Sequence, residues 1–217
     1  MRSLRSLFLG LVLLSALPAA GSAQSGRLFE DAWFWGAKTG MMLFSTKAVE
    51  NAFVPLFGGE WLITRTRGAL YVSYDQAFFT ENSAIEDILN TGGVRIVEMT
   101  DMRRVTFAAL AFPKNLGGIR PYGGVGVALN FIQEAVPIGS FQSASHQNDI
   151  IATIEDQRTR GSVLLMGGVQ LQFMRLSIYG HGLMMPAQSG FLLNQRSTYI
   201  VEAGVRWNVG SAIEKIR

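Results

Sequence analysis

The chain of 217 residues contains no cysteine and only two histidines. Without cysteine, neither a disulfide nor a thiolate metal site can form, and no histidine or carboxylate cluster has the spacing of a metal site. We therefore expect no metal and no cofactor. After residue 23, no apolar run approaches the 18 or more residues of a membrane-spanning helix. If the rest of the chain enters a membrane, it must do so as a closed barrel, in which every backbone group is paired.

The N-terminus has the pattern of a secretory signal peptide. Arg2 and Arg5 precede an apolar run over residues 7–17, and the small residues Gly21 to Ala23 follow it. We predict cleavage after Ala23, which makes residues 1–23 a signal peptide and residues 24–217 a single domain. Removal of two arginines changes 19 basic and 16 acidic residues to 17 and 16, so the charge gives no reason to expect a nucleic-acid partner.

Eight later segments alternate apolar with small or polar residues, which is typical of β-strands with two different faces. Their length of about 9 to 13 residues is what a tilted strand needs to cross a bilayer. In the fourth segment, Val105 and Phe107 lie on the face opposite Leu110 and Phe112, so a bulge or another register is expected there. The segments are AWFWGAKTGMMLF (32–44), LFGGEWLIT (56–64), ALYVSYDQAFF (69–79), RRVTFAALAF (103–112), YGGVGVALNF (122–131), SVLLMGGVQLQF (162–173), RLSIYGHGLMM (175–185) and STYIVEAGVRWNVG (197–210).

Short and long connections alternate along these segments. The short ones are RTRG, PKNLGG and MR, and much longer links separate the other pairs. An up-and-down membrane barrel has this pattern, whereas a Greek-key sandwich has no reason to show it. Ser83, Glu86 and the Gly92–Gly93 pair predict a short capped helix within residues 82–93. Residues 144–161 either extend two strands or form another helix.

The two faces of the segments differ in chemistry. The polar face carries four basic and three acidic residues among glycines and alanines, as the narrow lumen of an eight-stranded barrel would require. The apolar face places aromatic residues toward strand ends, where membrane barrels carry girdles. A soluble lipocalin-type barrel with the apolar face inward is the alternative. We predict a lumen network of Lys38, Glu60, Asp75, Arg104, Arg175, His181, Glu202 and Arg206, and a girdle of Trp33, Trp35, Trp61, Tyr199 and Trp207.

The predicted fold is all-β, a closed eight-stranded antiparallel up-and-down transmembrane β-barrel. Over residues 30–210, and best in YIVEAGVRWNVG, the chain resembles the small outer-membrane β-barrels of Gram-negative-type bacteria, such as the outer-membrane protein A transmembrane domain and outer-membrane proteins X and W. This resemblance implies a bacterial outer-membrane location with both termini in the periplasm. It also implies contact with the lipid bilayer and lipopolysaccharide, and insertion by the barrel-assembly machinery. Such barrels commonly end on an aromatic residue, whereas SAIEKIR follows the last strand here. Either Trp207 with Val209 acts as an internal signal, or a different signal is used.

Three functions remain open after this comparison. The first is a barrel with a salt-bridged, largely plugged lumen that serves envelope structure or surface interaction through its extracellular loops. The second is a narrow channel for small or apolar solutes, and the third is a lipid-modifying enzyme. Ser177 and His181 are the only candidate nucleophile and base, and Leu183 stands where outer-membrane lipid A deacylases have serine two positions after histidine. We therefore expect the first function and no catalytic residue, and the partners of the loops stay open.

Overall fold

A computed structural model describes residues 29–90, 92–113, 116, 118–193 and 196–211. The predicted signal peptide, and the tail after Ser211, lie outside these residues. Within them, no helix is both long and apolar enough to cross a membrane. The elements are β1 (Ala32–Phe44), β2 (Ala52–Thr64), β3 (Gly68–Glu86), β4 (Val94–Ala111), β5 (Ile119–Pro137), α3 (Ala144–Gln157), β6 (Thr159–Phe173), β7 (Leu176–Met185) and β8 (Thr198–Ser211).

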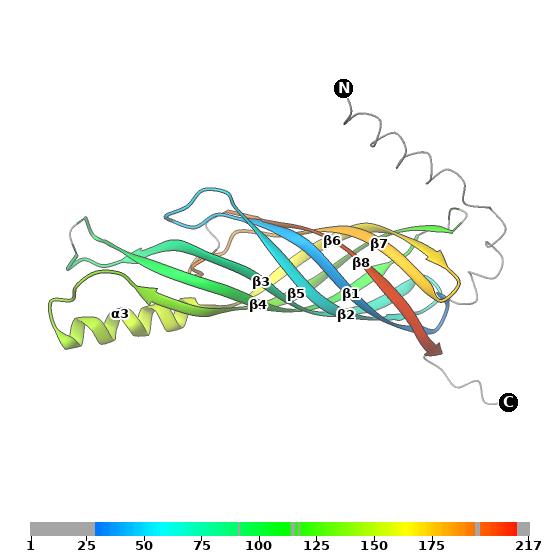
Figure 1. The fold of residues 1–217 in the computed structure, drawn as a ribbon, viewed down its shortest axis with the longest axis horizontal. Helices are drawn as coiled ribbons and strands as arrows, with labels where there is room; N and C mark the ends of the chain where they lie inside the picture. The colour runs from blue at the N-terminus through cyan, green and yellow to red at the C-terminus, as the bar shows by residue number, and fades with distance from the viewer. Residues whose placement is uncertain (1–28, 91, 114–115, 117, 194–195, 212–217) are drawn as a thin grey trace, which may run out of the picture.

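The eight strands form one closed antiparallel barrel in chain order (Figure 1). Closure comes from β1 and β8, which pair from Ala32 with Ser211 to Leu43 with Tyr199. The first and last described strands therefore begin and end at the same end of the barrel, where the short β2–β3 and β6–β7 turns also lie. The predicted fold class is confirmed.

The polar face of the strands points into the barrel. On β8, Val201 is 68% exposed, whereas the neighbouring Glu202 is 1% exposed. The same alternation holds on β5, where Val125 and Val127 are exposed and Asn130 is buried. Since successive side chains of a strand point to opposite faces, the apolar face forms the barrel's exterior. The soluble alternative, with the apolar face inward, does not describe this chain.

Strand β4 is continuous, and this resolves its ambiguous pattern. Phe107 lies on the exterior, whereas Leu110 and Phe112 are buried because they fill the lumen at the end where β1 begins and β8 ends. The bulge lies earlier in the strand, at Asp101, which has a φ of 53°. There the β3–β4 register shifts between Ala77 and Thr80.

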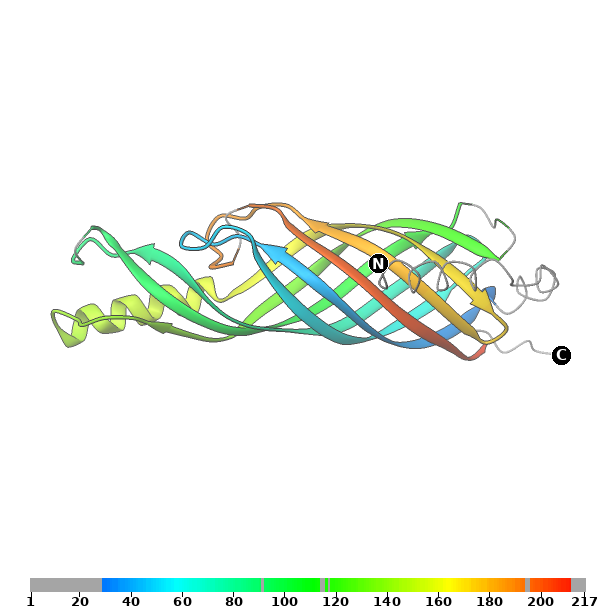
Figure 2. The same cartoon turned by 45° about the horizontal axis from the view of Figure 1, so that its top comes forward.

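Strands β3, β4 and β5 extend beyond their neighbours. They have 19, 18 and 19 residues, whereas β1 and β2 have 13 each. The extension and α3 project from the end opposite the short turns (Figures 1 and 2). The helix predicted within residues 82–93 is wrong, because β3 continues to Glu86 and pairs Ile85 with Arg95. A helix forms instead in the β5–β6 connection, where Ser143 caps α3 by accepting a hydrogen bond from the His146 amide.

Candidate functional site: the polar lumen

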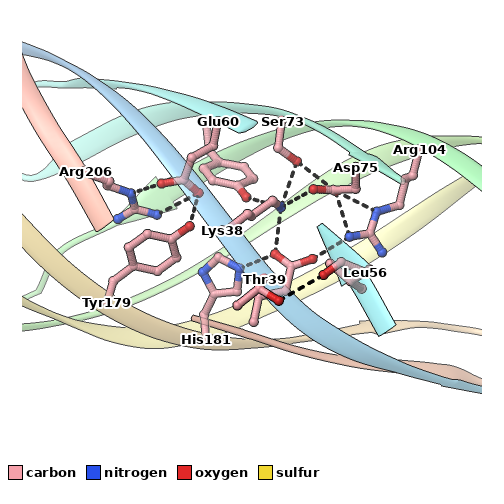
Figure 3. Close-up of polar contacts among 12 residues, drawn as sticks. Lys38, Thr39, Leu56, Glu60, Ser73, Asp75, Arg104, Tyr179, His181 and Arg206 are labelled. Atoms are coloured by element: carbon pink, nitrogen blue, oxygen red, sulfur yellow. Dashed lines mark hydrogen bonds and ion pairs between the residues drawn. The ribbon is translucent and has the colours of Figure 1, made fainter. Parts of the chain in front are cut away.

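Six charged side chains meet inside the barrel (Figure 3). Lys38 and Glu60 come from β1 and β2, and Asp75, Arg104, Glu202 and Arg206 come from β3, β4 and β8. Each has at most 5% of its surface exposed. The three cations equal the three carboxylates in number. A neutral cluster of this kind avoids the large cost of an uncompensated buried charge.

Glu202 joins three other strands. Its Oε2 lies 2.7 Å from Lys38 Nζ and 2.8 Å from His181 Nε2, and its Oε1 lies 2.6 Å from Arg104 Nη2. Strands β8 and β4 stand four positions apart in a ring of eight, so the contact with Arg104 spans the lumen.

Asp75 completes a ring with the same two cations. Its Oδ1 lies 2.8 Å from Lys38 Nζ, and its Oδ2 lies 2.8 Å from Arg104 Nη2. Lys38 also donates to Tyr71 Oη at 2.8 Å and to Ser73 Oγ at 3.1 Å. Each of the two carboxylates therefore contacts both cations. The mutual attraction of these ion pairs acts against the desolvation cost of burying them, although Asp75 Oδ1 and Arg104 Nη1 have no hydrogen-bond partner among the described residues.

A second group lies nearer the short turns, around Glu60. Arg206 Nε forms an ion pair with the Glu60 carboxylate, and Tyr179 Oη donates to it at 2.6 Å. The guanidinium of Arg206 stacks 3.6 Å from the centroid of the Tyr179 ring and donates to Gln170 Oε1 at 2.7 Å. Arg206 thus pairs with a carboxylate, stacks on an aromatic ring and donates to a side-chain amide oxygen. A planar guanidinium can make all three contacts in a buried site.

His181 links the network to the aromatic residues around it. A carboxylate only accepts hydrogen bonds, so Nε2 carries the proton shared with Glu202. Nδ1 then accepts from Tyr122 Oη at 2.8 Å. The neutral imidazole satisfies both contacts, and the six-charge cluster stays balanced without it.

Glycines on the lumen face make room for these side chains. A Cβ on Gly204 would lie 2.6 Å from Tyr179 Oη and 2.5 Å from the Ala37 carbonyl oxygen. A Cβ on Gly58 would lie 2.1 Å from Asp75 Oδ1. Glycine is favoured at these two positions because an added Cβ would also lie 2.5 Å from a backbone carbonyl oxygen, that of Ala37 at Gly204 and that of Tyr74 at Gly58.

Apolar layers lie on both sides of the network. On the side of the extension, a cavity of about 10 Å³, which is at the lower limit for one water molecule, is lined by residues that include Met42, Phe44, Met102, Met185 and Leu193. Leu193 belongs to the β7–β8 connection and is 3% exposed.

At the other end, an aromatic group fills the lumen. Phe29 is fully buried and packs on Phe112 with ring centroids 4.8 Å apart, and Phe112 packs on Tyr122 at 5.2 Å. The guanidinium of Arg120 stacks 4.0 Å from the Phe29 ring centroid. The described lumen is thus occupied by three successive layers of side chains.

The structure brings together all but one of the predicted lumen residues. Arg175 lies in the two-residue turn between β6 and β7, where its side chain is exposed, so its predicted place in the lumen is wrong. The segment predicted over residues 175–185 begins one residue later in the structure, at Leu176. Conversely, Tyr71, Tyr179 and Gln170 belong to the network but were not predicted as site residues. Their position on the polar face, together with Asp75 and His181, was the available signal.

The predicted girdle residues all point outward, but they are unevenly distributed. Trp35 pairs with Trp61 on β2 and with Trp207 on β8, and Trp33 packs on Trp61 at 5.4 Å. All four tryptophans therefore lie on three adjacent strands near the short turns, whereas Tyr199 lies at the opposite end of β8.

Ser177 and His181, the candidate nucleophile and base, do not contact each other in the described lumen. Ser177 lies four residues from His181 on β7, which is about 13 Å along a strand, and its hydroxyl accepts a hydrogen bond from Gln170 instead. Within the described part of the chain, no group of three histidine, aspartate or glutamate side chains could hold a metal ion.

A separate buried cluster holds the extension together. Asp87 accepts from Arg95 Nε at 2.7 Å and from His146 Nε2 at 2.9 Å, and its Oδ1 also accepts from the Leu89 amide. Burial acts to raise the pKa of Asp87, but the hydrogen bonds from Arg95, His146 and Leu89 outweigh it and hold this pKa below its ordinary value. The cluster ties the β3–β4 hairpin to the first turn of α3.

No protein-family model and no curated protein sequence matches the chain. Its structure is similar to that of Neisserial surface protein A, with a TM-score of 0.54 and 12% identity over 81% of this chain and 96% of that one. It is also similar to Ail, the attachment invasion locus protein of Yersinia pestis, with a TM-score of 0.50 and 10% identity over 82% and 99% of the two chains. At such low identity the likeness concerns the fold: the chain has the fold of the small eight-stranded outer-membrane β-barrels, as its sequence pattern indicates.

Proposed function

We propose that the chain is an integral outer-membrane protein whose barrel is a closed anchor, and that its work is done by the parts that project from the membrane. The observation that carries this proposal is the pairing of three buried cations with three buried carboxylates across the lumen. A paired cluster leaves no free charge to attract ions, and breaking one pair is costly.

The channel alternative would need a continuous polar path along the barrel axis. On the side of the extension, the lumen holds a cavity of about 10 Å³, which is lined mainly by apolar side chains together with Asn130, Ser162 and Thr198. On the other side of the network, Phe29 and Phe112 are in van der Waals contact across the lumen. These two layers and the charge network are three separate obstacles to a permeating solute, so we favour the closed anchor.

The exterior supports the membrane location in this proposal. Bulky side chains such as Val163, Leu165 and Val169 are each at least half exposed, which in water would form an apolar surface much larger than those of soluble monomers. The tryptophan cluster near the short turns suits the periplasmic interface. Both termini of the chain would then lie in the periplasm, and the extension at the opposite end of the barrel would stand outside the cell.

Solute permeation tests the closed anchor. The refolded chain is inserted into liposomes, and swelling is recorded in small sugars and in a small apolar amino acid, with a general porin as the positive control. We expect swelling rates equal to those of protein-free liposomes. Swelling in either solute at a rate that scales with the amount of inserted chain would overturn the closed anchor in favour of a channel.

A further inference from the structure

The extension has two faces with different partners within the molecule. We call it the arm. It comprises the parts of β3 and β4 that lie on the side of the Asp101 bulge away from the short turns, together with the end of β5 and α3. Its inner face carries Ile85, Asp87 and Arg95, and the last two meet His146 and Phe141 from the β5–β6 connection. The outer face has no covering element among the described residues.

Four apolar side chains form the centre of the outer face. Val94 and Ile96 of β4 are 46% and 37% exposed, and Val136 and Ile138, at the end of β5, are 47% and 49% exposed. The Ile138 amide donates to the Ile96 carbonyl, and Val136 lies opposite Glu98 in the register. The four side chains are therefore neighbours on one surface, in the part of the sheet that extends past β2, whose pairing with β3 ends at Ala77.

Carboxylates surround this centre. Glu86 lies opposite Val94 on β3, Glu98 lies opposite Val136, and Glu134 lies opposite Thr100, and all three are exposed. The arm as a whole is acidic, although the chain has a formal net charge of +3. Over residues 81–98 and 133–158, eight acidic and two basic residues give a net charge of −6: Glu81, Glu86, Asp87, Glu98, Glu134, Asp149, Glu155 and Asp156 against Arg95 and Arg158.

The arm is also held rigidly at its tip. The buried Asp87 fixes the β3–β4 turn through Arg95 and His146, and Gln142 Nε2 donates to the Leu89 carbonyl at 2.6 Å. Ile88 is 91% exposed on this braced turn. Such bracing lowers the entropy cost of presenting an apolar surface to a partner.

We propose that the outer face of the arm is a docking surface for a protein partner that has an apolar centre bordered by lysine and arginine. An apolar core with a polar rim is the general anatomy of protein interfaces, and here the rim has one sign. A second copy of this chain would bring carboxylates against carboxylates, and an anionic lipid or lipopolysaccharide surface would repel the same rim. The inference rests on the proposed function, because it assigns the partner class of the projecting arm.

Two labelled amphipathic peptides probe this surface. They share the same leucine positions and carry lysine in one and glutamate in the other at all polar positions. Binding is measured by fluorescence anisotropy on the full chain in nanodiscs of zwitterionic lipid, after subtraction of empty nanodiscs. We expect the Leu–Lys peptide to bind about tenfold more tightly than the Leu–Glu peptide, because only the former matches the rim.

Two pairs of variants test the assignment to the outer face. Ile96→Ser with Val136→Ser removes half of the apolar centre, and Ile151→Ser on α3, where Ile151 is 41% exposed, is its control. Glu86→Gln, Glu98→Gln and Glu134→Gln together neutralise the rim, and Asp149→Asn, Glu155→Gln and Asp156→Asn together remove the same charge from α3. We expect a loss of about fivefold or more from each outer-face variant and a smaller loss from its control.

Three outcomes would overturn the docking surface. Equal binding of the two peptides would do so, as would an equal loss from the α3 charge variant, or Leu–Lys binding that appears only when the nanodiscs contain anionic lipid. Liposome swelling on the same preparation separates this test from that of the closed anchor. A chain that lets solutes pass but still binds the Leu–Lys peptide more tightly contradicts only the closed anchor. A chain that lets no solute pass but binds the two peptides equally contradicts only the docking surface.

Discussion

Glu202 Oε1 lies 2.6 Å from Arg104 Nη2, and the two residues come from β8 and β4, which stand on opposite sides of the barrel. The ion pair therefore links two strands on opposite sides of the barrel across the lumen. Glu202 also contacts Lys38, so one carboxylate neutralises parts of two cations. Removal of the Glu202 charge should therefore lower the stability of the whole network.

Glu202→Gln should destabilise the barrel by about 3–5 kcal/mol, because it leaves excess positive charge buried on Lys38 and Arg104. Urea titration of the refolded chain in lipid vesicles measures this loss. The matched control is Glu155→Gln, whose carboxylate pairs with Arg158 at the surface and should contribute at most about 1 kcal/mol. If the two substitutions lowered the free energy of unfolding equally, the lumen ion pairs would contribute no more to stability than a surface pair.

Gly204→Ala should destabilise the barrel by about 1–3 kcal/mol. Its Cβ would lie 2.6 Å from Tyr179 Oη and would push that ring away from Glu60. Gly182→Ala is the control, because its Cβ would lie in ordinary contact, 3.8 Å from the Ile200 carbonyl oxygen. The thermal stability of the two variants is compared through the heat-dependent shift in electrophoretic mobility. A Gly204→Ala variant as stable as the wild type would contradict the close packing of Tyr179 on Gly204.

Acid should reduce the hydrogen-exchange protection of the β3–β4 hairpin in the arm. The pKa of Asp87 lies below its ordinary value, so its contribution to stability is present above about pH 4, the ordinary aspartate pKa. This contribution is lost as the pH falls through the lowered pKa of the folded state. Hydrogen exchange of the β3–β4 hairpin amides, after correction for intrinsic rates, should therefore accelerate as the pH falls below about 4. Asp87→Asn should already be loose at neutral pH; a hairpin that is equally protected in this variant would contradict the brace.

The tryptophan cluster should report the depth of the short-turn end. Trp33, Trp35 and Trp207 are 39%, 57% and 52% exposed at adjacent strand ends. Because they all lie near one interface, lipids brominated near the headgroup should quench the emission more than lipids brominated near the bilayer centre. Trp207→Phe should leave this order unchanged. Stronger quenching by the deep bromines would place the cluster inside the hydrocarbon and contradict the orientation.

Strand number, strand order and the inward direction of the polar face follow from the sequence, because period-2 alternation assigns each residue to a face. Lys38, Glu202 and Arg206 were predicted in the lumen on that ground alone. Arg175 was not placed correctly, since alternation does not show where a strand ends and its turn begins. Nothing in the pattern shows which charges pair, because register between strands is a long-range property.

The arm could not be predicted for a related reason. Ser83 and Glu86 have the spacing of a helix cap, but cross-strand pairing of Ile85 with Arg95 and the hydrogen bond from Ser83 Oγ to the Leu192 carbonyl stabilise a strand instead. The partner residues are distant in sequence or lie in another connection. Local propensity is decided here by contacts that a local pattern does not contain.

Planar-bilayer conductance tests the central claim, the closed lumen, most directly. The refolded wild-type chain is compared with a Glu202→Gln, Arg206→Gln variant, which removes one charge of each sign and leaves the net charge unchanged. A silent wild type, beside a variant that opens intermittently, is the result we predict, because the paired charges close the barrel. A steady wild-type conductance at the same protein density would contradict the closed anchor and make the chain a small channel.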